Sequence, residues 1–314
     1  MKPIQSALIV GAGAVGSAVA DSIFRGDPSA VAVLASGERL LRFRAEGFMV
    51  NGELRRFPLI SQGDAVPGFW PADLIIVAVK NHHLTRAIED MRRFVGSSTL
   101  ILSLLNGISS EEELAAAFGA EKVPYAVVIG IDAVREGTST RFSSTGKIHF
   151  GDARNPERRW SERVTRIADF FTRTGVGFTV PQDMLKTLWF KFMINVGINQ
   201  ASAVMRAPYK TFQTDPHARA VMDAAMEEVI AVSTAMGTGL GRADMEAWYA
   251  VLSGLGPEGK TSMLQDVEAG RVTEVEAFAG TVMRLGAREG IPVPVNTLLY
   301  HVLKSEERRC SKTS

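Results

Sequence analysis

The stretch Ala7-Leu8-Ile9-Val10-Gly11-Ala12-Gly13-Ala14-Val15-Gly16 decides the fold of the first half of this 314-residue chain. A short apolar run typical of a buried strand leads directly into the glycine pattern G-x-G-x-x-G, and a helical pattern follows. Gly11 permits a tight turn, Gly13 lets a pyrophosphate approach the backbone, and Gly16 lets helix and strand pack closely. Phosphates would rest on the helix N-terminus, so the sequence predicts a dinucleotide site over Gly11–Gly16.

The rest of the first half alternates apolar runs with helical patterns. We expect strands at residues 7–10, 30–35, 74–79, 99–104 and 125–131. We expect helices at residues 14–24, 38–46, 84–94 and 110–117. Such alternation predicts a parallel sheet with helices on both faces, whereas residues 48–60 and 141–151 resemble local antiparallel excursions.

Beyond about residue 181 the pattern becomes helical. We expect helices at residues 183–205, 216–236, 242–252, 262–268, 274–289 and 295–307. The segment Thr273–Glu276 fits a capping box, which predicts a helix start there. The sequence therefore predicts an α/β Rossmann-type dinucleotide-binding domain, residues 1–181, followed by an all-α substrate-binding domain, residues 182–314.

The composition excludes several classes of protein. With 46% hydrophobic and 22% charged residues it is typical of a soluble globular protein, and a net charge of +1 leaves no electrostatic footprint for nucleic acid. No apolar run reaches the roughly 18 residues that span a bilayer, and the N-terminus lacks the pattern of a signal peptide. The single cysteine, Cys310, excludes a disulfide framework. We therefore expect a cytoplasmic protein with no membrane partner and no metal site.

The end of the second predicted strand favours NADP(H) over NAD(H). An NAD site usually has an acid there for the ribose 2′-hydroxyl, but no acid lies at the tip of residues 35–39. Ser36 and Arg39 could bind a 2′-phosphate, while Glu38 could instead bind a free ribose. The alternative for Arg39 is a solvated residue in the first turn of a helix.

Two further strand ends carry polar side chains, Lys80 and Asn106. Ligands of open α/β sheets bind beyond the carboxyl ends of the strands, so we expect both residues to face the cofactor. The alternatives are a surface lysine for Lys80 and an Asn-Gly turn for Asn106.

A polar row marks the first helix of the second half. Lys191, Asn195 and Asn199 recur every four residues in an apolar segment, and four helical residues turn about 400°, so the three side chains share one face. Burying such groups is costly unless they bond each other or a ligand. The row therefore predicts either a structural network or a polar pocket.

Taken together, these motifs resemble the ketopantoate reductase (2-dehydropantoate 2-reductase) family over nearly the whole chain. The resemblance rests on Gly11–Gly16, Val79-Lys80, Asn106-Gly107, Trp189-x-Lys191-x3-Asn195-x3-Asn199, Thr261-Ser262-Met263-Leu264-Gln265-Asp266 and Arg271-x-Thr273-Glu274. It implies a 6-phosphogluconate-dehydrogenase-like fold and the NADPH-dependent reduction of 2-dehydropantoate to D-pantoate in pantothenate biosynthesis.

The resemblance also assigns roles to individual residues. Lys191 matches the general acid, while Asn106 and Glu274 match residues near the nicotinamide ribose and the reacting centre. The substrate-binding residues are Asn195, Asn199 and Ser262, and the backbone of Ala133 contacts the cofactor. The chemistry agrees, because hydride arriving at a ketone carbon leaves negative charge on the oxygen, and an ammonium can stabilise that charge and supply the proton. Ser262 as a helix N-cap and Glu274 as a first-turn acid are the structural alternatives.

The chain departs from the family at four places, one of which is His83, where the family often has glutamine. Ser36 stands where many members have an arginine, Tyr209 stands where some have a substrate-contacting asparagine, and Ala279-Gly280 replaces a frequent Asn-Gly. A reductase of the same family acting on a bulkier or less polar 2-oxo acid is therefore an alternative function. A non-catalytic NADP(H) sensor is another, although it would not need Lys191, Ser262 and Glu274 together. We expect a small-molecule 2-oxo acid as the partner, and the helical domain offers a surface for a homodimer.

Overall fold

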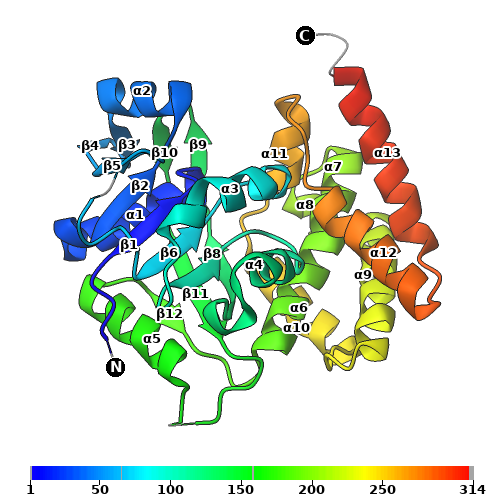
Figure 1. Ribbon diagram of the computed structural model, residues 1–314. Coiled ribbons are helices and arrows are strands. Elements are labelled where there is room, and N and C mark those ends of the chain that lie inside the picture. Colours follow the sequence, from blue (N-terminus) through cyan, green and yellow to red (C-terminus); the bar gives the residue numbers. More distant parts are fainter. Residues whose placement is uncertain (1, 65, 158, 311–314) are drawn as a thin grey trace. The chain divides into compact units, whose positions relative to one another are not determined.

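The computed structural model describes residues 2–64, 66–157 and 159–310, which form two compact units (Figure 1). Unit 1 comprises the chain up to Leu105 together with Ser110–Thr187, and unit 2 comprises Asn106–Ser109 and the chain from Leu188 onward. None of the helices in these described residues is long and apolar enough to cross a membrane. The domain boundary that we place at residues 181 and 182 stays a prediction.

A five-stranded parallel sheet forms the centre of unit 1. Its strands, in spatial order, are β5 (Leu59–Ile60), β2 (Val31–Leu34), β1 (Ala7–Val10), β6 (Leu74–Val77) and β7 (Leu100–Ser103). In the central register Ala7 pairs with both Val31 and Leu74. The strands β1, β2, β6 and β7 are buried along their whole length, which explains why they read as continuous apolar runs.

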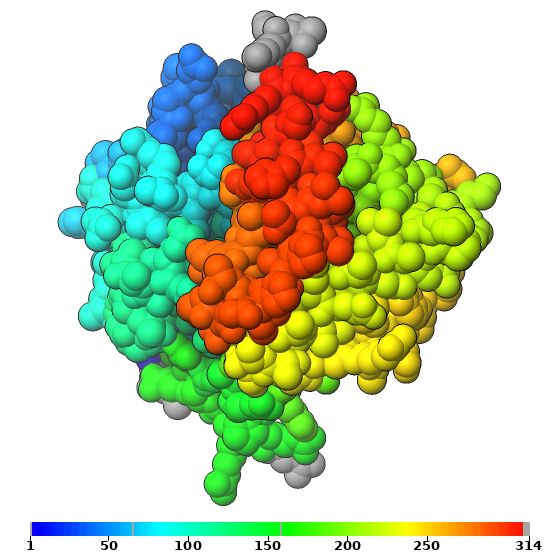
Figure 2. Space-filling model, turned by 90° about the vertical axis from the view of Figure 1, so that its right-hand side faces the viewer, coloured from blue at the N-terminus to red at the C-terminus, as the bar shows by residue number. Residues whose placement is uncertain are grey.

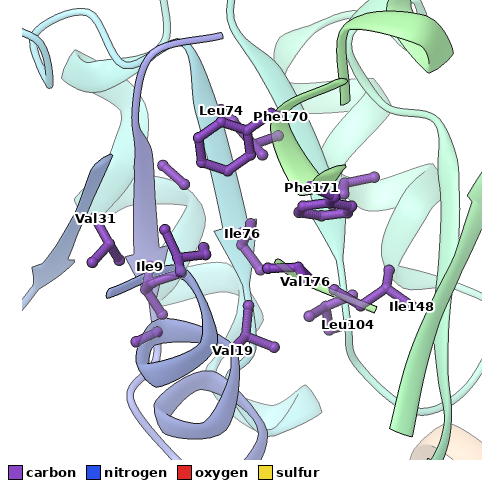
Figure 3. Packing of buried hydrophobic residues seen from close by; sticks show 14 of the residues in the cluster. Ile9, Val19, Val31, Leu74, Ile76, Leu104, Ile148, Phe170, Phe171 and Val176 are labelled. Atoms are coloured by element: carbon purple, nitrogen blue, oxygen red, sulfur yellow. The ribbon is translucent and has the colours of Figure 1, made fainter. Parts of the chain in front are cut away.

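Helices cover both faces of this sheet. They are α1 (Ala14–Gly26), α2 (Gly37–Glu46), α3 (Leu84–Met91), α4 (Ser110–Phe118) and α5 (Glu162–Thr174), with a 3₁₀ turn at Arg92–Phe94 after α3. Alternate strand residues enter two separate cores: Ile9 and Ile76 pack with Phe170 and Phe171 of α5 (Figure 3), whereas Leu8 packs on the opposite face with residues of α3 and α4. The predicted fold class is therefore confirmed, although α5 had not been expected.

The strand predicted at residues 125–131 does not join the parallel sheet. It forms β8 (Tyr125–Ile131), which pairs antiparallel with β11 (Thr145–Gly151), and β12 (Phe178–Thr179) pairs parallel with β11. The expectation of a fifth parallel strand there was wrong: β8 pairs with β11, which follows it after a short hairpin and without a crossover helix. A hairpin returns the chain in the opposite direction, while a parallel pair needs a crossover of a dozen or more residues.

A third small sheet contains that hairpin, β9 (Val134–Glu136) and β10 (Ser139–Arg141), beside β3 (Phe48–Val50) and β4 (Glu53–Arg55). Asn51 and Gly52 connect β3 to β4 with φ of 48° and 83°. Both angles are positive, as a tight two-residue hairpin turn requires. The predicted antiparallel excursion is confirmed for β3 and β4, whereas β5 at its end extends the parallel sheet.

The second half of the chain is helical, as the sequence predicts. The elements are α6 (Met184–Ile194), a π-helix (Asn195–Asn199), α7 (Gln200–Met205), α8 (Tyr209–Thr214), α9 (Pro216–Ala235), α10 (Arg242–Gly254), α11 (Ser262–Glu268), a second π-helix (Glu276–Gly280), α12 (Thr281–Glu289) and α13 (Pro294–Cys310). An apolar core joins them, and α13 lies on the outer surface of this unit (Figure 2). The predicted helix at residues 183–205 is continuous but contains the π-helical turn, and α8 had not been expected.

The predicted capping box at Thr273–Glu276 is wrong. The N–H and the hydroxyl of Thr273 donate to Glu307, at 2.9 and 2.6 Å, whereas Glu276 accepts a hydrogen bond from the hydroxyl of Tyr300 at 2.8 Å. A carboxylate from α13 therefore takes the place that local sequence assigned to Glu276. The helical winding begins at Glu276, two residues later than the expected start.

Glu111 is a buried carboxyl group of unit 1 that forms no ion pair with any of the described residues. Glu111, in the first turn of α4, is 4% exposed. It accepts hydrogen bonds from the hydroxyl of Ser110 at 3.0 Å and from the N–H of Ala126 at 3.4 Å. Burial raises the pKa of Glu111 to about 7 from an ordinary value of 4.5. The native state therefore holds a proton that the unfolded chain has released between these two pH values.

Stability should fall as the pH rises from about 4.5 to 7, because the folded state binds more protons than the unfolded state in this window. We expect Glu111→Gln to remove this dependence and to raise the free energy of unfolding at pH 8 by up to about 3 kcal/mol, since one pKa unit is worth about 1.4 kcal/mol. Denaturant unfolding at pH 5 and pH 8 measures the free energy of unfolding of the wild type and of the variant. Glu112→Gln, at an exposed neighbouring residue, is the control and should keep the pH dependence of the wild type. If both variants lose the same stability between pH 5 and pH 8, Glu111 is not the cause of the dependence.

Candidate functional site

The glycine loop of unit 1 has the geometry of a phosphate-binding turn. Gly11 has φ of 98°, and a Cβ there would lie 2.8 Å from the carbonyl of Ala78. A Cβ at Gly16 would lie 2.0 Å from the carbonyl oxygen of Gly11. A Cβ at Gly13 would meet nothing closer than 3.8 Å. The fold itself therefore requires Gly11 and Gly16, while the space beside Gly13 is open.

The same loop presents an uncapped helix N-terminus. Gly13 occupies the N-cap position of α1, and α1 begins at Ala14, so no side chain caps the first N–H groups. The first turn carries no acidic residue. Unsatisfied N–H groups and the positive end of the helix dipole together favour a bound anion. The segment Gly11–Gly16 thus fits the diphosphate of a dinucleotide.

The other predicted cofactor residues of unit 1 lie at the carboxyl ends of its strands. Ser36 precedes α2 directly after β2, its hydroxyl makes no capping bond, and Arg39 lies exposed one turn into α2. Within the described residues Arg39 has no ion-pair partner. Lys80 follows β6 and is partly buried, and Ala133 lies between β8 and β9. Ser36 and Lys80 thus follow strands of the parallel sheet, whereas Ala133 follows a strand of a different sheet.

The polar row of the second half lies in unit 2. Asn195 and Asn199 are 3% and 7% exposed, and Lys191 is partly buried. Asn195–Asn199 winds as a π-helix, so the regular α-helical spacing from which the shared face is predicted does not hold there. At Gly197 a Cβ would lie 2.5 Å from side-chain atoms of Met226 on α9, so α9 packs directly against the wide turn.

A chain of hydrogen bonds joins three of the predicted site residues. The amide nitrogen of Asn106 donates to Glu274 at 2.9 Å, and the amide nitrogen of Asn195 donates to the Asn106 oxygen at 3.4 Å. Glu274 is only 5% exposed. Gly107 has φ of 101°, so Asn106 also lies in the turn that was its structural alternative. Residues from three distant parts of the sequence thus meet in unit 2.

Lys191 and Asn199, at the two ends of the polar row, differ from Asn195 in having no side-chain hydrogen bond among the described residues. Within the part of the chain that the structure describes, neither the Lys191 ammonium nor the Asn199 amide makes a hydrogen bond or an ion pair. Burial lowers the pKa of Lys191 below its ordinary value of 10.5. Buried polar groups are nearly always hydrogen-bonded in folded proteins, and leaving one without a partner is costly. The row is therefore only partly a structural network, and its two ends can bind a ligand.

Ser262 does not cap α11, so that alternative is wrong. The N-cap is Thr261, whose hydroxyl accepts from the N–H of Leu264 at 3.2 Å and lies 2.5 Å from the hydroxyl of Ser202 on α7. Ser262 is the first residue of α11, is exposed, and makes no hydrogen bond within the described residues. Its hydroxyl remains available to a ligand.

Sequence reasoning missed two residues that hold these sites in place. Glu307 binds Thr273, the neighbour of Glu274, and forms an ion pair with Lys304 at 2.9 Å. In unit 1, Arg135 of β9 donates to the hydroxyl of Ser17 at 2.9 Å. No local pattern signals either contact, because each partner is remote in the chain.

Of the two departures from the family expected at the rim of the pocket, Ala279 and Tyr209, Ala279 lies in the core instead. Ala279 is fully buried in the apolar core of unit 2, so it presents no side chain to a ligand. Tyr209 is only partly buried, and its ring lies against Gly259, where a Cβ would be 2.9 Å from the ring. Tyr209 is therefore the one of the two that can alter the rim.

Comparison with known proteins identifies the family of this chain. The family model described as ketopantoate reductase PanE/ApbA matches residues 7–155, and the model described as its C-terminal part matches residues 183–307. The 2-dehydropantoate 2-reductase of Aquifex aeolicus (strain VF5) is 26% identical over 312 residues, which cover 97% of each chain.

Solved structures share the fold. A PanE/ApbA family ketopantoate reductase from Ralstonia eutropha JMP134 superposes with a TM-score of 0.83 at 26% identity, covering 97% of this chain and 99% of that one. A D-mandelate dehydrogenase in complex with NADH and anilino(oxo)acetate reaches a TM-score of 0.85 at 18% identity, with the same coverage. The chain therefore belongs to the ketopantoate reductase family of dinucleotide-binding oxidoreductases.

Proposed function

We propose that this protein is a cytoplasmic NADPH-dependent 2-dehydropantoate 2-reductase, which forms D-pantoate for pantothenate biosynthesis with Lys191 as the general acid. The observation that carries the proposal is the Lys191 ammonium, which is partly buried and makes no hydrogen bond or ion pair among the described residues. The names of curated relatives such as the Aquifex aeolicus enzyme supply the substrate. Membership of the family supplies the reaction class.

The environment of Lys191 suits proton donation to a ketone oxygen. NADPH, when bound, supplies the hydride that reaches the ketone carbon. The carbonyl π bond breaks, its electrons move to the oxygen, and the Lys191 ammonium gives that oxygen a proton, leaving a neutral amine. A lowered pKa makes the ammonium a readier donor near neutral pH, and partial burial strengthens its attraction for the developing negative charge.

The neighbouring polar groups suit binding and orientation of the substrate. Asn199 and Ser262 offer neutral donors, which orient a carboxylate and hydroxyl groups without adding charge. Glu274 holds the amide of Asn106, and Asn106 accepts from Asn195. These two hydrogen bonds fix the orientation of both amide groups, and so determine which of their donors and acceptors can bind a ligand. We assign substrate binding to Asn195, Asn199 and Ser262, and orientation at the reacting centre to Glu274 and Asn106.

The cofactor proposal rests on the features of unit 1. The open space at Gly13 and the uncapped start of α1 fit a diphosphate. Ser36 and Arg39 lie where the adenosine ribose of a bound dinucleotide falls, beyond the end of β2, and a cation there favours a 2′-phosphate. Lys80 follows β6 and Ala133 follows β8, and we assign the Lys80 side chain and the Ala133 backbone to the same cofactor site.

A second candidate is reduction of a different 2-oxo acid, and Tyr209 favours it. This aromatic ring, which packs beside the loop leading to Ser262, replaces the amide that some relatives have at this position. A bulkier and less polar substrate would suit such a rim. The two candidates share the chemistry of Lys191 and differ only in the carbon skeleton of the substrate.

We expect Lys191→Ala to lower kcat/KM for 2-dehydropantoate by about 10²–10⁴-fold, the usual contribution of a general acid, while the Kd for NADPH stays within about twofold. NADPH oxidation at 340 nm measures the first quantity and fluorescence titration the second. Lys210→Ala, at an exposed lysine of α8, is the control and should match the wild type. Full activity of Lys191→Ala would refute the mechanism. A higher kcat/KM of the wild type for another 2-oxo acid would select the second candidate.

Substitutions in the glycine loop should separate binding from folding. Gly13→Ala adds a Cβ into open space at φ of −76°, so we expect unchanged thermal stability but an NADPH Kd raised by about tenfold or more, because the methyl group would occupy the place of the diphosphate. Gly16→Ala should destabilise the protein itself, since its Cβ would clash with the carbonyl of Gly11. Thermal unfolding and NADPH titration test both. Wild-type affinity in Gly13→Ala would show that the cofactor does not lie on this loop.

A further inference from the structure

We propose that Arg135, which β9 brings to the glycine loop from a distant part of the chain, forms with Arg39 and Arg42 a three-arginine site for the 2′-phosphate of NADP(H). The inference rests on the proposed use of this cofactor and names the residues that select it. It gives a role to an arginine outside β2 and α2, in a chain whose residue directly after Ala35 at the end of β2 is the uncharged Ser36.

The position of Arg135 on β9 directs its side chain toward the glycine loop. Side chains alternate along a strand, and the neighbours Val134 and Glu136 are exposed and line a hollow on the other side of the hairpin. Arg135 is partly buried instead. Its Nε donates to the carbonyl of Gly137 at 2.9 Å, which fixes the plane of the guanidinium group.

Two contacts attach this guanidinium group to the loop itself. Its Nη1 donates to the hydroxyl of Ser17 at 2.9 Å and to the carbonyl oxygen of Ala12. Its Nη2 makes no hydrogen bond within the described residues. The group is thus held beside the predicted diphosphate turn with one edge unused, and a guanidinium edge matches the geometry of phosphate oxygens.

The ring of Phe43, in α2, contacts the guanidinium groups of both Arg135 and Arg42. This ring is 5% exposed, and the guanidinium carbons of Arg135 and Arg42 lie 5.5 and 5.8 Å from its centroid. Attraction between a cation and a ring face stabilises each contact. Arg39, three residues before Arg42, lies on the neighbouring turn of the same helix. Two segments that are remote in the sequence thus place positive charges around one ring.

The cluster has no counter-charge. Among the described residues none of Arg39, Arg42 and Arg135 forms an ion pair. Burial, together with repulsion by Arg42 and Arg39, lowers the pKa of Arg135 to about 10. Like charges held together are unfavourable, and a phosphate dianion would remove the repulsion while accepting the unused hydrogen bonds. The free ribose hydroxyl of NAD(H) would relieve none of it, so the cluster favours NADP(H).

The test compares the binding of NADP⁺ and NAD⁺ to the full-length protein by calorimetric or fluorescence titration, without any substrate. We expect the wild type to prefer NADP⁺. Arg135→Gln should weaken NADP⁺ binding by about tenfold or more, as expected for loss of a charged hydrogen bond, and should change NAD⁺ binding by less than about threefold. Arg141→Gln, at an exposed arginine of the adjacent strand β10, is the matched control and should change neither.

Each other outcome is decisive. Equal weakening of both cofactors in Arg135→Gln would mean that Arg135 only supports the glycine loop, and an unchanged preference would mean that it does not reach the phosphate; either result overturns the inference but leaves NADP(H) in place. A wild type that prefers NAD⁺ would overturn the cofactor proposal itself. Arg42→Gln, at an exposed position, should also weaken NADP⁺ selectively, so the test stands even if Arg135→Gln fails to fold.

Discussion

The constraint on which unit 2 depends is the partial burial of one ammonium group, that of Lys191, without a counter-ion among the described residues. A cation in such a place is unfavourable in the ligand-free protein and has to be held there by the surrounding fold. The apolar core of unit 2 does this, since Trp189, Phe192 and Met193 beside Lys191 are all buried in it. The stability of that core offsets the cost of holding this charge in place.

Both π-helices of unit 2 lie at or next to the predicted site residues. The first, Asn195–Asn199, holds two of the amides, and the second, Glu276–Gly280, begins two residues after Glu274. A π-helical turn is rare compared with an α-helical turn and is frequently found at functional sites. Here the packing of Gly197 on Met226 and the ion pair of Glu276 with Lys304 tie the two turns to α9 and α13. The site is thus supported by contacts with helices that carry none of its proposed catalytic groups.

The sequence predicts the features that depend on local pattern. Continuous apolar runs identify the four long strands of the parallel sheet, and the glycine spacing identifies the loop after β1. The direction of β8 could not be predicted, because an apolar run says nothing about whether its partner is parallel. Neither could the π-helical winding, which depends on how closely α9 approaches Gly197. Glu307 and Arg135 act on partners 34 and 123 residues away, so no local pattern marks them, whereas Lys191, Asn195 and Asn199 are visible as polar residues in an apolar helix.

The central claim is that the Lys191 ammonium is the proton donor to the substrate oxygen, and a crystal structure with NADP⁺ and an unreactive 2-oxo acid analogue tests it most directly. We expect Nζ of Lys191 to lie within about 3 Å of the oxygen that corresponds to the ketone, with Asn199 and Ser262 bound to the carboxylate or hydroxyl groups. A ketone oxygen that is bound by another residue or by water, with Lys191 beyond hydrogen-bond distance, would contradict it.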